Sequence, residues 1–191
     1  CTVTKKTDYQ SRQLIRKAIK ANPVAKIIVT GCYAELKDEE LQKIDGISFI
    51  IGKDYKETLI KKLFLKDNSK EPLLRLEPVI PKDRTRAFLR IQDGCENYCS
   101  YCIIPRVRGN IRSALPEKII ETIKKLEDKG IKEIVLSGIH IGKYGKELEN
   151  QNLKKLLEIL SKTGFKGRFR LSSIEPYEID ADLINILKST P

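Results

Sequence analysis

The sequence predicts an α/β protein in two parts, an open α/β domain followed by the first half of a parallel (β/α) barrel. Three observations predict it. Short apolar runs alternate with helical periods, a charged stretch rich in proline interrupts them near the middle, and three strand–helix pairs follow that interruption. Strands that alternate with helices are typical of a parallel sheet. Half a barrel has an open edge, and the chain begins at Cys1 without any methionine, so we expect a fragment of a longer protein.

The first predicted part covers residues 1–65 and begins with an amphipathic helix. Apolar residues recur at helical spacing beside basic residues over 8–21. A buried strand is predicted over 26–30, and Gly31-Cys32 marks its end, where α/β sheets commonly place ligands. The remaining predicted elements are a short helix over 38–44, a strand over 47–51 and a helix over 55–65.

Residues 66–84 are the predicted linker, because they combine charges and three prolines without a sustained period. The second part, 85–191, starts with a strand over 86–92. A helix is predicted over 116–129, since proline stands at its start and Gly130 follows its end. The later predicted elements are a strand over 133–137, a helix over 153–162, a strand over 168–172 and a helix over 181–188.

A cysteine-rich loop follows the first strand of the second part. Cys95, Cys99 and Cys102 have the spacing Cys-x-x-x-Cys-x-x-Cys. Three thiolates can hold three irons of a 4Fe-4S cube and leave the fourth iron open for a substrate. A structural zinc site usually needs four ligands, and the only histidine, His140, lies far away in sequence. Zinc and unrelated core thiols remain the alternatives at this point.

Charge and composition limit the choice of partner and compartment. The chain of 191 residues carries a net charge of +11, and residues 1–26 hold seven basic residues against one acidic residue. This surplus favours a polyanionic partner, although solvated lysines would give the same count. Arg106, Arg108 and Arg112 add a second basic group after the cysteines. No run of about 20 apolar residues or basic-then-apolar leader is present, so we expect a cytoplasmic protein without a membrane partner.

The cysteine loop resembles the signature of radical S-adenosylmethionine (SAM) enzymes, in which an aromatic residue, here Tyr101, precedes the last cysteine. The resemblance implies that the open iron binds the amino and carboxylate groups of SAM. An electron from the cube would then split SAM and give a 5′-deoxyadenosyl radical. In this superfamily the cofactor carries the difficult chemistry and the protein positions it.

Further segments resemble the methylthiotransferases of this superfamily: residues 1–4, 11–13, 29–34, 108–113 and 170–176. In that family three cysteines of the N-terminal domain hold a second 4Fe-4S cluster. Cys1 and Cys32 match two of these ligands, and the third would precede residue 1. The resemblance also implies that Ser137 and Gly138 lie near the methionine amino group of SAM, and that Arg112, Ser172 and Glu175 hold its carboxylate and ribose.

Residues 136–145, with the start of the chain, are most similar to the threonylcarbamoyladenosine tRNA methylthiotransferases. That resemblance implies addition of a methylthio group to C2 of N6-threonylcarbamoyladenosine beside the anticodon. The implied partners are tRNA, an electron donor such as flavodoxin or ferredoxin, and a sulfur source. His140 would then be a residue characteristic of this subfamily and not a metal ligand. The alternatives are the isopentenyladenosine enzyme, the enzyme that modifies an aspartate of a ribosomal protein, and a non-catalytic RNA-binding module with bound iron–sulfur cluster or zinc.

Overall fold

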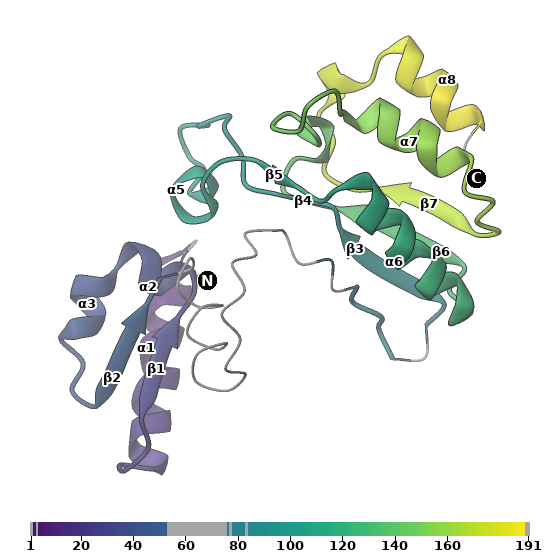
Figure 1. Ribbon diagram of the computed structural model, residues 1–191. Helices are drawn as coiled ribbons and strands as arrows, with labels where there is room; N and C mark the ends of the chain where they lie inside the picture. The colour runs from purple at the N-terminus through teal and green to yellow at the C-terminus, as the bar shows by residue number, and fades with distance from the viewer. Residues whose placement is uncertain (1, 3, 53–75, 77, 83, 190–191) are drawn as a thin grey trace. The chain divides into compact units, whose positions relative to one another are not determined.

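The computed structural model describes residues 2, 4–52, 76, 78–82 and 84–189 (Figure 1). It confirms a mixed α/β protein with parallel sheets. The chain divides into two compact units. The first unit comprises Cys1–Glu71 and Cys99–Arg108, and the second comprises Pro72–Tyr98 and Gly109–Pro191. The helix predicted over 55–65 and most of the predicted linker lie outside the described residues.

The first unit pairs two parallel strands, β1 (Ile27–Thr30) and β2 (Ile47–Ile51). Helix α1 (Lys5–Ala21) begins three residues before the predicted start, because the Thr4 hydroxyl accepts a hydrogen bond from the Thr7 amide at 3.2 Å and caps it. Three short helices complete the described part of this unit: α2 (Cys32–Leu36), α3 (Asp38–Gln42) and α5 (Ile104–Arg108).

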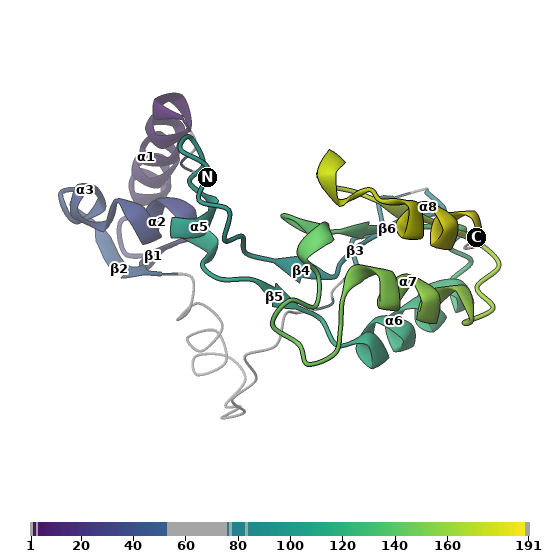
Figure 2. The ribbon, with the colours of Figure 1, turned by 90° about the horizontal axis from the view of Figure 1, so that it is seen from above.

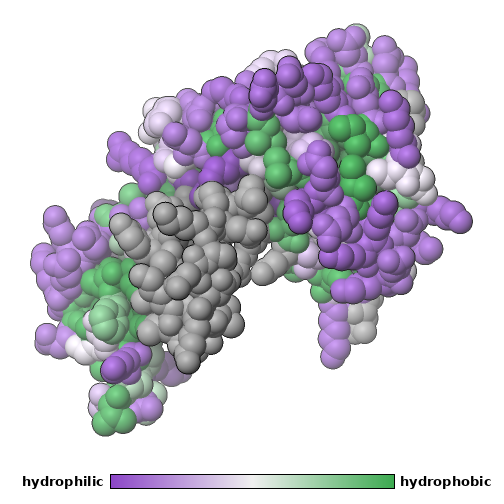
Figure 3. Space-filling model, in the orientation of Figure 1, coloured by the Kyte–Doolittle hydropathy of each residue, from purple (hydrophilic) through white to green (hydrophobic). Residues whose placement is uncertain are grey.

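A small apolar cluster holds the first unit together. Tyr33, Ala34, Leu41 and Ile44 are buried, and side chains of α1, β1 and β2 pack against them. On the other side of the strands Ile28 and Phe49 are exposed. Figure 3 shows hydrophobic residues gathered over this part of the first unit.

The second unit contains a parallel sheet with the order β3-β6-β7. Its strands are β3 (Arg86–Arg90), β6 (Glu133–Ser137) and β7 (Arg168–Leu171). Helices α6 (Pro116–Asp128), α7 (Leu153–Ser161) and α8 (Ala181–Ser189) connect or follow them. The same unit has two 3₁₀ turns, η2 (Ile141–Lys143) and η3 (Pro176–Glu178).

The strand predicted over 86–92 ends earlier, at Arg90. Ile91 donates its amide to Ser137 of β6 at 2.8 Å, and its carbonyl accepts the Ala114 amide at 2.8 Å. The chain therefore leaves the parallel sheet and enters an antiparallel ribbon of β4 (Gln92–Asp93) and β5 (Arg112–Ser113). Figures 1 and 2 show this narrow ribbon continuing from β3.

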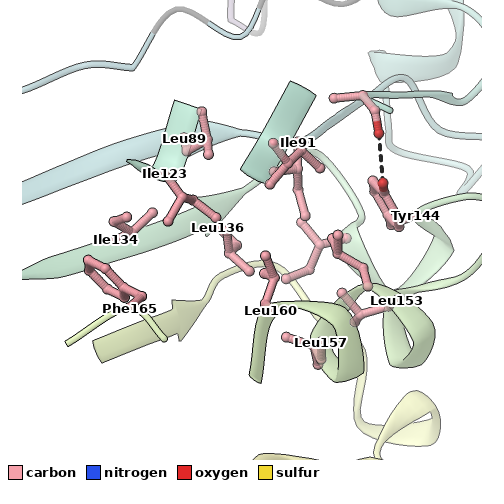
Figure 4. Packing of buried hydrophobic residues seen from close by; sticks show 14 of the residues in the cluster. Leu89, Ile91, Ile123, Ile134, Leu136, Tyr144, Leu153, Leu157, Leu160 and Phe165 are labelled. Atoms are coloured by element: carbon pink, nitrogen blue, oxygen red, sulfur yellow. Dashed lines mark hydrogen bonds between the residues drawn. The ribbon is translucent and has the colours of Figure 1, made fainter. Parts of the chain in front are cut away.

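Side chains point alternately to the two faces of the sheet, and the core lies on the face that carries the buried apolar side chains. Leu89 of β3 and Ile134 and Leu136 of β6 are fully buried and belong to one cluster with apolar residues of α6, α7 and α8. All three helices therefore cover the same face of the sheet. Figure 4 shows Ile123, Leu136 and Leu160 meeting inside this cluster.

Cross-strand charges support the register at the amino end of the sheet. Glu133 stands opposite both Arg86 and Arg168, and its carboxylate lies 2.5 Å and 3.1 Å from their guanidinium nitrogens. Opposite charges on neighbouring strands disfavour a slipped register, which would separate them.

Replacing Leu136 by alanine should lower the free energy of unfolding by about 2–5 kcal/mol, because it leaves a cavity in the middle of this core. Denaturant titration followed by circular dichroism would measure the loss. Leu115→Ala is the control, since that side chain is 36% exposed. Equal losses for the two variants would contradict the assignment of Leu136 to the core.

Among the described residues, no helix combines the length and the apolar character needed to cross a membrane.

Candidate functional site

The cysteine loop starts with a sharp turn at Gly94. This residue has φ +78°, and a Cβ atom there would collide with the backbone carbonyl of Asn110. Only glycine satisfies both conditions without displacing backbone. The Cys95 amide then donates to the Gly109 carbonyl at 3.2 Å, and the Cys95 side chain is buried.

The other two cysteines of the motif lie on the turn that follows. The Cys102 amide donates to the Cys99 carbonyl at 2.9 Å. Cys99 is exposed and Cys102 half-buried, and both are free thiols, as are Cys32 and Cys95. The described residues contain no group of three or more His, Cys, Asp or Glu side chains placed to hold a metal ion. The boundary between the units falls between Cys95 and Cys99, so the joint site of the three thiols stays a prediction from sequence.

Gln92 connects the cysteine loop to the segment that follows β6. Its side-chain nitrogen donates to the carbonyls of Asp93 at 3.0 Å and Gly94 at 2.7 Å. Its side-chain oxygen accepts the amides of Ile139 at 3.0 Å and His140 at 2.9 Å. The residue is fully buried, so these four bonds use the hydrogen-bonding capacity of the amide group.

Gly138 packs directly against Gln92. A Cβ atom at position 138 would lie 2.8 Å from the Gln92 side-chain oxygen and 2.8 Å from Ile141 Cγ2. The structure thus gives a packing reason for this glycine. Its predicted place beside the methionine group of SAM stays a prediction.

His140 lies beside the first cysteine and is buried. Its Nε2 is 2.9 Å from a carboxylate oxygen of Glu178, and its Nδ1 is 3.2 Å from the Asn97 side-chain nitrogen and 3.9 Å from Cys95 Sγ. A carboxylate only accepts hydrogen bonds, so Nε2 carries the proton and Nδ1 accepts from Asn97. Lys143 Nζ lies 3.6 Å from the same Glu178 oxygen. We did not expect Asn97 or Glu178 from the sequence.

Two predicted SAM contacts carry buried polar atoms without a partner. The Nε atom of Arg112 and the hydroxyl of Ser172 are buried and have no hydrogen-bond partner among the described residues. Arg112 Nη2 lies 3.4 Å from Asp93 Oδ2. Buried polar groups are normally satisfied, so both atoms are candidates for contact with a ligand.

Of the remaining predicted contacts, Ser137, Ser172 and Glu175 belong to the second unit, whereas Tyr101 belongs to the first. Ser137 is the last residue of β6, and the Ser172 amide just after β7 donates to Leu136 at 3.2 Å. Glu175 is exposed and donates its backbone amide to Glu178 at 3.1 Å. Tyr101 is 90% exposed. Carboxyl ends of parallel strands are where α/β proteins place their active sites.

Cys32 begins α2 in the first unit and is half-buried, whereas Cys1 lies outside the described residues. The next residue, Tyr33, accepts a hydrogen bond from Arg12 at 2.7 Å and donates one to Glu40 at 2.9 Å. Burial raises the pKa of the Tyr33 hydroxyl. The hydrogen bond from Lys37, followed by that from Tyr33, lowers the pKa of Glu40. This network fixes α1 against α2 and α3 immediately beside Cys32.

Comparisons with known proteins agree with the motif. The radical SAM superfamily matches residues 89–189, and the uncharacterized protein family UPF0004 matches residues 1–52. The chain is 40% identical to the threonylcarbamoyladenosine tRNA methylthiotransferase MtaB of Bacillus subtilis and 35% identical to that of Aquifex aeolicus. These alignments cover 98% and 99% of this chain but 44% and 49% of the relatives.

A third relative has a different named product. The tRNA-2-methylthio-N(6)-dimethylallyladenosine synthase of Thermodesulfovibrio yellowstonii is 33% identical over 98% of this chain and 46% of its own length. The chain therefore spans a little under half the length of the curated relatives it matches. The match over residues 89–189, which includes the cysteine motif, shows that the chain belongs to the radical SAM superfamily.

Proposed function

We propose that the protein is a tRNA methylthiotransferase that adds a methylthio group to C2 of N6-threonylcarbamoyladenosine beside the anticodon. The observation that carries this proposal is the 40% identity to the Bacillus subtilis enzyme over 98% of this chain, which includes the cysteine motif. The relative from Thermodesulfovibrio yellowstonii supports a second candidate, the isopentenyladenosine substrate, at lower identity.

Membership of the radical SAM superfamily implies SAM and a 4Fe-4S cluster. The free thiols of Cys95, Cys99 and Cys102 suit the cluster, and the unpartnered buried atoms of Arg112 and Ser172 suit SAM. We infer that Cys95, Cys99 and Cys102 hold this cluster, because all three are free thiols on one loop. The bound cluster supplies the electron that cleaves SAM. The protein's own residues bind and orient the substrates, and the residues that bury the Cys95 side chain keep water away from it.

Arg112 and Ser172 are the best supported of the proposed SAM contacts, because their buried polar atoms lack partners among the described residues. The guanidinium of Arg112 suits a carboxylate, and the Ser172 hydroxyl can donate to or accept from a ribose. The fuller proposed set of contacts is Tyr101, Arg112, Ser137, Gly138, Ser172 and Glu175.

The domain limits remain a proposal from the sequence. We propose an N-terminal methylthiotransferase domain over 1–65, a linker over 66–84 and a radical SAM core over 85–191 that forms the first half of a parallel barrel. The matches over 1–52 and 89–189 and the parallel order β3-β6-β7 support this division. Cys32, with Cys1 and one further cysteine, would hold a second 4Fe-4S cluster on the first domain.

A tRNA partner agrees with the charge of the first unit. Lys5, Lys6, Arg16, Lys17 and Lys20 of α1 are exposed, so their charges are accessible to phosphates. We propose a cytoplasmic location, where such an enzyme would meet its tRNA substrate. The reaction also requires a sulfur source and an electron donor, for which flavodoxin and ferredoxin are candidates.

The test is the nucleoside profile of tRNA from cells that lack the intact gene, measured by mass spectrometry. We expect loss of the 2-methylthio form of threonylcarbamoyladenosine and its return when the gene is restored. A gene with Cys95, Cys99 and Cys102 replaced by alanine should not restore it. Loss of the 2-methylthio form of isopentenyladenosine would instead support the second candidate substrate. An unchanged profile would reject both and favour the ribosomal protein as substrate.

A further inference from the structure

We propose that His140 is a positioning residue that fixes the cysteine loop through a relay from Glu178 to His140 to Asn97. The inference rests on the proposed function, because it assigns to this relay the task of keeping Cys95 in place for the cluster. Asn97 lies between Cys95 and Cys99 in the sequence, so a bond to its side chain constrains the segment that joins these two thiols.

The two central side chains of the relay, His140 and Glu178, are largely shielded from water. The side chains of His140 and Glu178 are 4% and 11% exposed, and they meet at 2.9 Å. Burial of a ring nitrogen and a carboxylate is unfavourable unless each finds a partner. Glu178 binds Nε2, Asn97 binds Nδ1 at 3.2 Å, and the ring stands 3.9 Å from Cys95 Sγ. Both ring nitrogens are thus used, and the ring edge lies against the first thiol.

Two features of the backbone around His140 allow its ring to contact both Glu178 and Asn97. Gln92 accepts the His140 amide at 2.9 Å and holds the residue from the side of β4. Gly142 faces Glu178, and a Cβ atom at position 142 would collide with the Glu178 carboxylate. Glycine at 142 therefore lets the carboxylate approach the imidazole, while Lys143 compensates its charge at 3.6 Å.

These contacts bring together segments that are far apart in sequence. Gln92 comes before the cysteines, residues 138–143 follow β6, and Glu178 belongs to η3 after β7. Residues that orient metal ligands from behind typically contribute about 10- to 100-fold to metal affinity. The structure gives His140 this place behind Cys95 without making it a ligand.

The test compares variants of the full-length protein after anaerobic reconstitution with iron and sulfide. The readout is the rate at which iron is lost to an excess of chelator, followed by absorbance. His140→Ala should lose iron about 10- to 100-fold faster than the wild type. Asn97→Ala should show the same direction, and because Asn97 is exposed its truncation leaves the fold intact.

Two conservative variants separate positioning from general stability. In His140→Asn the side-chain oxygen takes the place of Nδ1 and can still accept from Asn97, so slow iron loss should return. His140→Gln places its amide near Glu178 instead and should lose iron as fast as His140→Ala. Tyr144→Phe is the matched control, because it removes a buried 2.6 Å hydrogen bond to Ala114 in the adjoining segment without touching the cysteine loop.

Each failure has its own signature. If the wild type binds no iron, or binds it equally with all three cysteines replaced, the proposed function is wrong. If iron binding needs the cysteines but His140→Ala retains iron like the wild type, the positioning role is wrong. The role is equally overturned if Tyr144→Phe loses iron as fast as His140→Ala, or if His140→Asn and His140→Gln behave alike, including a common failure to fold.

Discussion

Replacing Cys95, Cys99 or Cys102 by alanine is expected to reduce the formation of 5′-deoxyadenosine from SAM to the background without protein. Each thiolate of a 4Fe-4S cluster holds a separate iron, so the loss of one leaves two ligands on the loop. Liquid chromatography of reactions with a chemical reductant would measure the product.

Cys32→Ala is the matched control for this set. It removes a free thiol that is not part of the Cys95–Cys102 motif. We expect this variant to cleave SAM at a rate close to the wild type and to form no methylthio product. Cleavage that persists with Cys95, Cys99 and Cys102 all replaced would reject the assignment of the loop.

Gly94→Ala is expected to be the most damaging single substitution outside the cysteines. A methyl group at this position meets the Asn110 carbonyl, and the residue must also keep φ +78°. Because the obstacle is backbone, the loop has to move as a whole. We expect the free energy of unfolding to fall by more than about 4 kcal/mol, the range of severe substitutions, together with loss of SAM cleavage.

Gly130→Ala separates the two causes. Gly130 has φ +76°, almost the same as Gly94, but a Cβ atom there meets nothing within 4 Å. This variant should lose only the conformational term of about 1–2 kcal/mol and keep its activity. Denaturant titration gives both values. Similar losses at the two glycines would show that the collision with Asn110 is relieved cheaply.

The regular elements were predictable where a strong period has clear ends. The predicted strands over 47–51 and 133–137 coincide with β2 and β6, and the helix predicted over 116–129 agrees with α6 to one residue. The short helices α2 and α5 were missed, because they begin in stretches that the sequence analysis interpreted as a strand end at Gly31-Cys32 and as a loop around the cysteines. The β4–β5 ribbon was missed because strands of two residues are too short to show an alternating pattern.

The candidate site divides in a similar way. Spacing along the chain predicts Cys95, Cys99 and Cys102 as ligands, because the three ligands proposed for one cluster stand close together in sequence. Spacing could not identify Gln92, Asn97 and Glu178, because their importance comes from contacts in the folded chain. Gln92 accepts a hydrogen bond from the His140 amide. The side chains of Asn97 and Glu178 contact the two ring nitrogens of His140. For Gln92 the sequence offered one signal, its place at the end of the predicted apolar strand over 86–92, and such a pattern is too common to be specific.

The four bonds of Gln92 also bear on how this protein ages. Hydrolysis of its side-chain amide would leave a carboxylate facing the carbonyl oxygens of Asp93 and Gly94, which now accept hydrogen bonds from it at 3.0 Å and 2.7 Å. Two attractions would become repulsions, and the turn into Cys95 would be forced open. Complete burial keeps the water needed for that deamidation away from the amide. Burial in the folded protein therefore protects from deamidation a side chain whose change would disturb the turn into Cys95.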